Sequence, residues 1–147
     1  MKVNLSINSS VKDTVINIET NEITDEIMQL INMLENFEKL DKIIAVKNDR
    51  KYLLSIKEVV RFYAQDKKVY LTHNNEDYIV KYYLYELEEK LDKNMFIRVS
   101  NSEIMNINYI ESLDTSFSGS IKVKTKTGII TYVSRGYLKE FKKILNL

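Results

Sequence analysis

Apolar and polar residues alternate at the start of the chain, where Val3, Leu5 and Ile7 occupy every second position. The stretch "VINIE" at 15–19 repeats this alternation after the polar "NSSVKDT". A period of two is the pattern of a half-buried strand, and a polar break between two such runs is typical of a hairpin. The pattern therefore predicts an N-terminal strand pair.

The period becomes helical over residues 25–40. Thr24 is suited to be the N-cap, and Asp25 and Glu26 place negative charge in the first turn, where the helix dipole favours it. Apolar residues then recur at helical spacing: Ile27, Leu30, Ile31, Leu34 and Phe37. A strand pair and one helix are too small to bury this stripe, so it packs either on the rest of the chain or on a second copy.

From Lys42 onward, short apolar runs are separated by polar turn clusters. The clusters "NDRK", "QDKK" and "HNNED" are rich in Asn and Asp, which favour tight turns. The runs around them predict strands at 42–47, 51–56, 59–65, 68–73 and 77–83.

Two further helices and a hairpin complete the pattern. Residues 83–91 place leucines at helical spacing, and residues 120–134 predict a hairpin that turns near Thr127-Gly128. Residues 135–147 predict a closing amphipathic helix with Leu138, Phe141, Ile144 and Leu145 on one side. Many short strands with a few helices predict a mainly β fold of the α+β class, with residues 1–41 as a ββα extension and 42–147 as the main domain.

Composition excludes most catalytic chemistry. The 147 residues include no cysteine and one histidine, His73, which argues against disulfides and against thiolate or His-rich metal sites. His73 ends a strand-like run before a turn, so we expect it to be solvated. The clustered carboxylates of Glu86, Glu88 and Glu89 fit the polar face of a leucine-bearing helix. We therefore predict no enzymatic activity, no metal and no cofactor.

No apolar run approaches the roughly 20 residues needed to span a bilayer. The first residues alternate and do not form the apolar core of a signal peptide. These features predict a cytoplasmic protein that does not insert into membranes.

Charge is unevenly distributed along the chain. Residues 1–48 contain five basic and eight acidic residues, whereas residues 98–147 contain eight basic and four acidic residues. Such an asymmetry points to a polyanionic partner for the C-terminal part.

The basic part begins with the stretch "FIRVSNSEIMNINYIESLD" at 96–114. It opens like a buried strand, becomes polar at Ser100-Asn101-Ser102, and turns apolar again at Ile104 and Met105. A polar patch between two core segments, with Arg98 beside it, is either a simple loop or a surface that recognises a partner.

Three segments together resemble the LytTR-type DNA-binding domain family: "RFYAQDKKVYLTHNNEDYIVKYYLYELEEKL", the stretch at 96–114, and "TYVSRGYLKEFKKIL". Family members typically carry Phe-x-Arg-x-His/Ser-x-Ser, an apolar pair, Asn and an isoleucine-rich strand. A Ser-Arg-Arg-Tyr-Leu-like element begins their last helix. The first motif corresponds to Phe96, Arg98, Ser100, Ser102, Ile104, Met105, Asn106 and Ile110, and the second to residues 134–138. The resemblance covers residues 43–147.

The resemblance implies a fold of elongated antiparallel β-sheets with short helices. It also implies a transcriptional regulator that presents loops to successive major grooves of double-stranded DNA, as a homodimer on direct-repeat half-sites. Without a receiver domain, the chain is similar to stand-alone regulators of low-GC Gram-positive bacteria.

Carried over residue by residue, the resemblance implies base contacts from Asn101, Arg135 and Lys68. Asn can pair with adenine and Arg with guanine through two hydrogen bonds. Phosphate contacts, which fix register without reading sequence, are implied for Lys67, Arg98, Ser100, Ser102, Ser134 and Lys139. Many relatives have a second basic residue where this chain has Gly136, and its replacement removes a phosphate contact.

Each assignment has a structural alternative. Asn101 can close a turn through its own backbone, and Arg135 can pair with Glu140. Lys67 and Lys68 can form a solvated hairpin tip, and Arg98 can form a salt bridge within its strand.

The whole chain also has an alternative reading, as a protein-interaction module that does not bind DNA. On that reading the partner surface is lined by tyrosines: Tyr52, Tyr63, Tyr82, Tyr83 and Tyr85.

Overall fold

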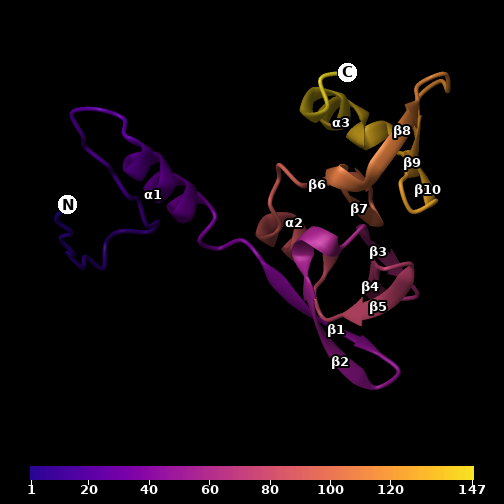
Figure 1. The fold of residues 1–147 in the computed structure, drawn as a ribbon, viewed down its shortest axis with the longest axis horizontal. Helices are drawn as coiled ribbons and strands as arrows, with labels where there is room; N and C mark the ends of the chain where they lie inside the picture. The colour runs from indigo at the N-terminus through magenta and orange to yellow at the C-terminus, as the bar shows by residue number, and fades with distance from the viewer. The chain divides into compact units, whose positions relative to one another are not determined.

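The chain divides into two units, Met1–Glu35 and Asn36–Leu147, in a computed structural model that describes residues 1–147 (Figure 1). The boundary between the units, after Glu35, lies a few residues before the one expected after residue 41.

The first unit contains one helix, α1 (Asp25–Glu35), and no strand. Thr24 is its N-cap, since its Oγ1 accepts a hydrogen bond from the Ile27 amide at 3.3 Å. α1 ends at Glu35, five residues before the predicted end of the helix; its less exposed face carries four of the predicted stripe residues, Ile27, Leu30, Ile31 and Leu34, although none of them is buried. The fifth, Phe37, lies beyond the helix and is 81% exposed.

The predicted N-terminal strand pair is wrong. Residues 2–19 form no strand, and Val3, Leu5 and Ile7 are 86%, 87% and 90% exposed. A period of two yields a strand only where another surface covers the apolar face, and a lone two-stranded hairpin is at best marginally stable in water. No surface within this unit covers the apolar face, so the alternating residues do not pair as strands.

The second unit is built on a seven-stranded antiparallel sheet in the order β2-β1-β5-β4-β3-β7-β6. Its strands are β1 (Lys42–Lys47), β2 (Arg50–Ser55), β3 (Arg61–Gln65), β4 (Lys68–His73), β5 (Glu76–Val80), β6 (Phe96–Ser100) and β7 (Glu103–Asn106). The helix α2 (Leu84–Lys90) connects β5 to β6. The predicted runs thus become strands close to their expected bounds.

A second, three-stranded sheet follows in the order β10-β9-β8. It consists of β8 (Ile110–Asp114), β9 (Ile121–Thr125) and β10 (Ile130–Val133), and the chain ends in α3 (Leu138–Ile144). The predicted turn near Gly128 is confirmed, and this glycine has a φ of +90° that other residues rarely adopt. The mainly β, antiparallel fold is therefore as the sequence predicts.

Asn- and Asp-rich pairs make the tight turns of the large sheet. Asn48-Asp49, Asp66-Lys67 and Asn74-Asn75 each connect two strands with both residues at positive φ. Two positive φ values are the mark of the type I′ turn, whose twist matches that of the strands it joins. Asn and Asp tolerate this conformation better than other residues with a Cβ, which explains the clusters.

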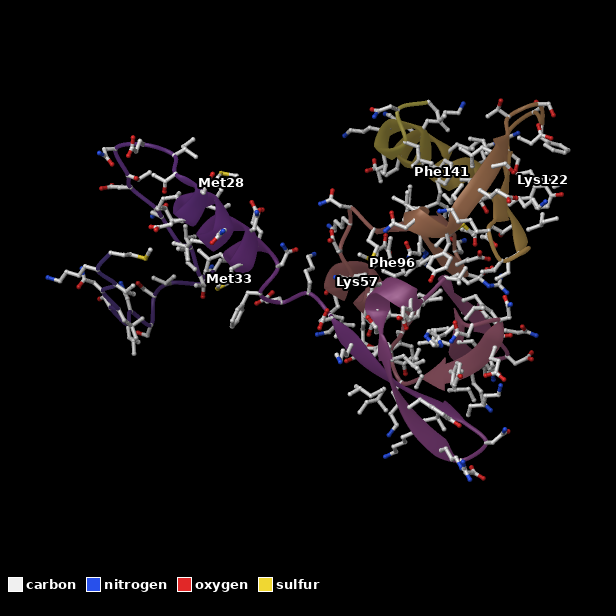
Figure 2. All side chains as sticks on the ribbon, viewed as in Figure 1. Met28, Met33, Lys57, Phe96, Lys122 and Phe141 are labelled. Atoms are coloured by element: carbon white, nitrogen blue, oxygen red, sulfur yellow. The ribbon has the colours of Figure 1, made fainter.

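The unit has two hydrophobic clusters, and the β6–β7 hairpin lies between them. One face of the hairpin gives Phe96 and Ile104 to a cluster with α2 and β1–β5, and the other gives Ile97, Val99 and Met105 to a cluster with β9, β10 and α3. Figure 2 labels one residue of each cluster, Phe96 near α2 and Phe141 on α3. Because a strand alternates its side chains between faces, one short hairpin can anchor both clusters.

The predicted solvated His73 is wrong. It is only 8% exposed, and its Nε2 lies 3.1 Å from Glu58 Oε2. Glu58 belongs to a 3₁₀ turn, Ile56–Glu58, fifteen positions before His73, so no local pattern around residue 73 reveals this contact.

No helix of the chain combines the length and apolar character that a bilayer-spanning helix requires.

Candidate nucleic-acid interface

The three segments implied in DNA contact lie at one end of the second unit. The antiparallel register of β3 with β7 pairs Tyr63 with Glu103, so the β3–β4 turn and the β6–β7 turn lie at the same sheet end. The Ala64 amide donates to the Ser102 carbonyl at 2.8 Å, and the Ser134 amide donates to the Val99 carbonyl at 2.8 Å. We call the set Asp66–Lys68, Ser100–Ser102 and Ser134–Lys139 the loop end.

The turn at Ser100–Ser102 differs from the other hairpin turns of the large sheet. None of its residues has a positive φ, and the ladder of β6 with β7 shifts register between Arg98 and Ser100. Such a bulge adds a residue to one strand and redirects the side chains beyond it. Beyond the buried Val99, Ser100 is half-buried and Asn101 is exposed.

The Arg98 side chain holds this turn through hydrogen bonds to its backbone. Its Nε donates to the Ser100 carbonyl at 2.7 Å, and its Nη2 donates to the Asn101 carbonyl at 2.6 Å. Its Nη1 donates to Glu88 Oε2 on α2 at 2.8 Å, and the Arg98 side chain is 15% exposed. The salt-bridge alternative for Arg98 is therefore present in the structure, with the guanidinium fork also closing the turn.

Asn101 is exposed at the tip of the turn. Its Oδ1 accepts a hydrogen bond from the Tyr137 hydroxyl at 2.7 Å, which ties the turn to the segment before α3. The two serines face each other, with their Oγ atoms 3.3 Å apart and the Ser102 amide donating to Ser100 Oγ at 3.2 Å. Backbone and side-chain bonds therefore both order this turn.

Arg135 follows Ser134 in a single 3₁₀ turn, Arg135–Tyr137, and is exposed. Its guanidinium lies against Gly119 in the β8–β9 loop, where a Cβ atom would come within 3.1 Å of Arg135 Nη2. The alternative pairing with Glu140 is not among the salt bridges of the structure. The sequence motif gives no sign of Gly119, because it lies sixteen positions earlier in a separate loop.

The lysines of the loop end are exposed and unpaired. Lys67 and Lys68 border the β3–β4 turn, and Lys139 lies in the first turn of α3. None of the three takes part in a salt bridge. Positive charge at this end is thus left available to an external anion.

Behind the turn, a buried carboxylate links the two sheets. Glu103 is 8% exposed, accepts a hydrogen bond from Thr131 of β10 at 3.2 Å and lies 3.5 Å from Arg61. Burial raises the pKa of the Glu103 carboxyl, and Arg61 and Thr131 oppose that shift in part.

The residues of the alternative readings mostly have structural roles. Glu86 caps α2 by accepting a hydrogen bond from the Tyr83 amide at 3.0 Å, and Glu88 pairs with Arg98. Tyr52 packs edge-on against Tyr78, and Tyr63 stacks on Tyr70. Only the stacked pair Tyr83 and Tyr85 is largely exposed, at 64% and 65%.

Comparison with known proteins agrees with the geometry. The family described as "LytTr DNA-binding domain" matches residues 49–146. An uncharacterized HTH-type transcriptional regulator of Staphylococcus aureus (strain NCTC 8325 / PS 47) is 33% identical over 147 residues, covering 100% of this chain and 99% of the relative. The corresponding protein of strain MRSA252 is 32% identical with the same coverage.

A solved LytTr DNA-binding domain from Bacillus cereus superposes with a TM-score of 0.71 at 27% identity, covering 74% of this chain and 99% of that one. In the second unit, strands separate α2 from α3 along the chain. The unit therefore lacks the two consecutive helices of a helix-turn-helix motif and resembles the solved LytTr domain instead. The family match, the full-length relatives and the shared fold lead to one conclusion: the chain belongs to the LytTr DNA-binding domain family.

Proposed function

We propose that this protein is a cytoplasmic, sequence-specific regulator of transcription that reads double-stranded DNA through its loop end. Asn101, Arg135 and Lys68 contact bases in major grooves. Lys67, Ser100, Ser102, Ser134 and Lys139 contact phosphates. No catalytic step is part of this function.

The observation that carries the proposal is the convergence of three distant segments on one exposed, basic end. Asn101 offers a carboxamide that matches adenine, and Arg135 offers a planar fork that matches guanine. The unpaired lysines supply charge for phosphates, whose neutralisation releases counterions and drives binding. These groups come from turns, strand ends and the segment that begins the last helix, which fits readout without a recognition helix.

Arg98 is the one predicted phosphate contact to which we give a different role. Three of its N–H groups are already engaged with Ser100, Asn101 and Glu88. We therefore assign it to holding the reading turn, with any phosphate contact secondary.

Dimerisation on direct-repeat half-sites is a further part of the proposal, with the first unit assisting. The exposed apolar side chains of residues 1–35 support it, since such surface is costly to leave in water. Sedimentation of the full chain and of a chain starting at Asn36 tests this part. That start keeps Leu40, which packs on the core of the second unit. Unchanged self-association in the shorter chain would remove the first unit from the proposal.

Selection of bound sequences from a random DNA pool, followed by fluorescence anisotropy on a recovered duplex, tests the central claim. We expect affinity to fall by about 10³–10⁵ between roughly 50 mM and 200 mM salt if six or more phosphates are contacted. Arg135→Ala should weaken binding by about 1–3 kcal/mol and relax preference at one base pair. Lys139→Ala is the matched control, and it should weaken all duplexes alike. A pool with no enrichment at low salt would exclude sequence-specific binding and favour a protein-interaction module.

A further inference from the structure

We infer that Tyr137 is a positioning residue for base recognition: its hydroxyl holds the carboxamide of Asn101 in a reading orientation. The inference rests on the proposed function and adds to it a residue outside the set of contact residues. Tyr137 does not itself touch DNA in this scheme.

The hydrogen bond leaves the reading atoms of Asn101 free. The Tyr137 hydroxyl donates to Asn101 Oδ1 at 2.7 Å. A carboxamide oxygen has two lone pairs and the Nδ2 group has two N–H donors, so one acceptor site and both donors remain. Adenine requires one acceptor and one donor, and the bond therefore fixes the amide without using up what a base needs.

Tyr137 is itself held in place from two sides. Its amide donates to the Ser134 carbonyl at 2.9 Å, and its ring packs, partly buried, against the cluster that contains Phe141. The guanidinium of Arg98 lies 5.9 Å from the centre of the ring. The hydroxyl is thus presented from a fixed ring, not from a mobile side chain.

Arg98 and Tyr137 together control both parts of Asn101. Arg98 Nη2 donates to the Asn101 carbonyl at 2.6 Å, and Tyr137 donates to the side-chain oxygen. An exposed Asn without these bonds would sample several rotamers, and binding would have to select one of them. Loss of the hydroxyl should therefore weaken binding about two- to tenfold, the effect of ordering one side chain on binding.

The test is a double-mutant cycle with Asn101→Ala and Tyr137→Phe. The probe is a duplex recovered by the selection described above, together with its single-base-pair variants. Tyr137→Phe removes only the hydroxyl and keeps the packed ring. Tyr85→Phe is the matched control, because Tyr85 is an exposed tyrosine on α2, outside the loop end. Thermal unfolding of each variant accompanies the titrations.

We expect Tyr137→Phe to weaken binding and to reduce discrimination at the same base pair that Asn101→Ala affects. In the Asn101→Ala background it should have no further effect, because the group it positions is gone. Tyr85→Phe should leave affinity and preference unchanged.

The failures of the two claims are distinguishable. If Asn101→Ala changes base preference while Tyr137→Phe does not, or if the two effects simply add, the inference is overturned and the proposed function stands. If Asn101→Ala itself leaves every duplex bound as before, the assignment of Asn101 fails and the inference falls with it.

Discussion

The two hairpin turns at the loop end are built in opposite ways. The turn at Asp66-Lys67 has both residues at positive φ and is closed by backbone geometry alone, with its side chains exposed. The turn at Ser100–Ser102 has no positive φ and is held by Arg98, Tyr137 and the hydroxyls of its own serines. Side chains of the first turn can therefore be substituted at little cost in stability. In the second turn, Arg98 and Tyr137 hold the backbone and the side chain of Asn101 in place. If the proposed function holds, we therefore expect base recognition to depend more on the second turn than on the first.

The largest contrast should come from truncating Arg98, which holds the second turn from β6, and Lys67, which is a residue of the first turn. Arg98→Ala leaves the Ser100 and Asn101 carbonyls without their donor and Glu88 without its partner, and hydrogen bonds of charged groups are the strong ones. We expect the free energy of unfolding to fall by about 2–4 kcal/mol. The matched change Lys67→Ala should stay within about 0.5 kcal/mol. Urea unfolding of both variants measures this, and equal losses would contradict the contrast.

A basic residue placed at position 136, beside Arg135, tests whether more positive charge near the Ser100–Ser102 turn strengthens DNA binding. A Cβ atom at position 136 would have no neighbour within 4 Å, and the φ of Gly136 is not positive, so a longer side chain fits there. Gly136→Arg should strengthen binding to all duplexes alike and steepen the salt dependence by about one phosphate contact.

Gly136→Gln is the control for Gly136→Arg, because it adds a side chain of similar reach without the charge. Equal gains in anisotropy titrations of both variants would show that the effect is not electrostatic.

The backbone of the first turn can be relaxed by one substitution. Lys67 has a φ of +63°, a conformation that a residue with a Cβ adopts at a cost. Lys67→Gly removes the cost of the positive φ but adds the entropic cost of ordering a glycine on folding, which is the smaller of the two. The free energy of unfolding should therefore rise by about 0.5–1 kcal/mol. Thermal unfolding checks the sign, with Lys68→Gly as the control at a neighbouring position without positive φ. A loss of stability in Lys67→Gly would mean that the lysine side chain contributes more than its exposure suggests.

The smallest expected effect concerns the carboxylate behind the braced turn. The pKa of Glu103 is raised in the folded state, so its protonated form is the one that folding favours. Its contribution to stability is therefore present at low pH and is lost as the pH rises through the raised pKa. Glu103→Gln keeps an uncharged group that can accept from Thr131.

We expect the stability of Glu103→Gln, relative to the natural chain, to improve between about pH 4 and about pH 7. Urea unfolding at both pH values measures the difference. Glu111→Gln, an exposed carboxylate on β8, is the control. A relative stability that falls with pH would mean that attraction to Arg61 outweighs burial.

Local chemistry made most of the fold predictable. The clusters around Asn48-Asp49, Asp66-Lys67 and Asn74-Asn75 mark type I′ turns, and the strands fill the spaces between them. Residues 2–19 show where this reasoning fails, because alternation specifies a face but not the surface that covers it. His73 failed for a related reason, since its partner Glu58 is fifteen positions away.

The candidate site was predictable in outline only. The motifs named Asn101 and Arg135, but the roles of Arg98 and Tyr137 depend on contacts that span ten and thirty-six positions. Tyr137 was visible as part of the motif before the last helix, and nothing in its spacing shows that its hydroxyl reaches Asn101. Gly119 gave no signal at all, because only the folded loop brings it to Arg135.

The position of the β6–β7 hairpin between two hydrophobic clusters has a calorimetric consequence. A turn anchored on both faces is already ordered before DNA arrives, so binding includes little coupled folding. The heat-capacity change of association should then reflect only the surface buried at the interface, without the large negative contribution that accompanies ordering of a segment. Isothermal titration at several temperatures measures this heat-capacity change as the slope of binding enthalpy against temperature. A rigid hairpin should give a shallow slope.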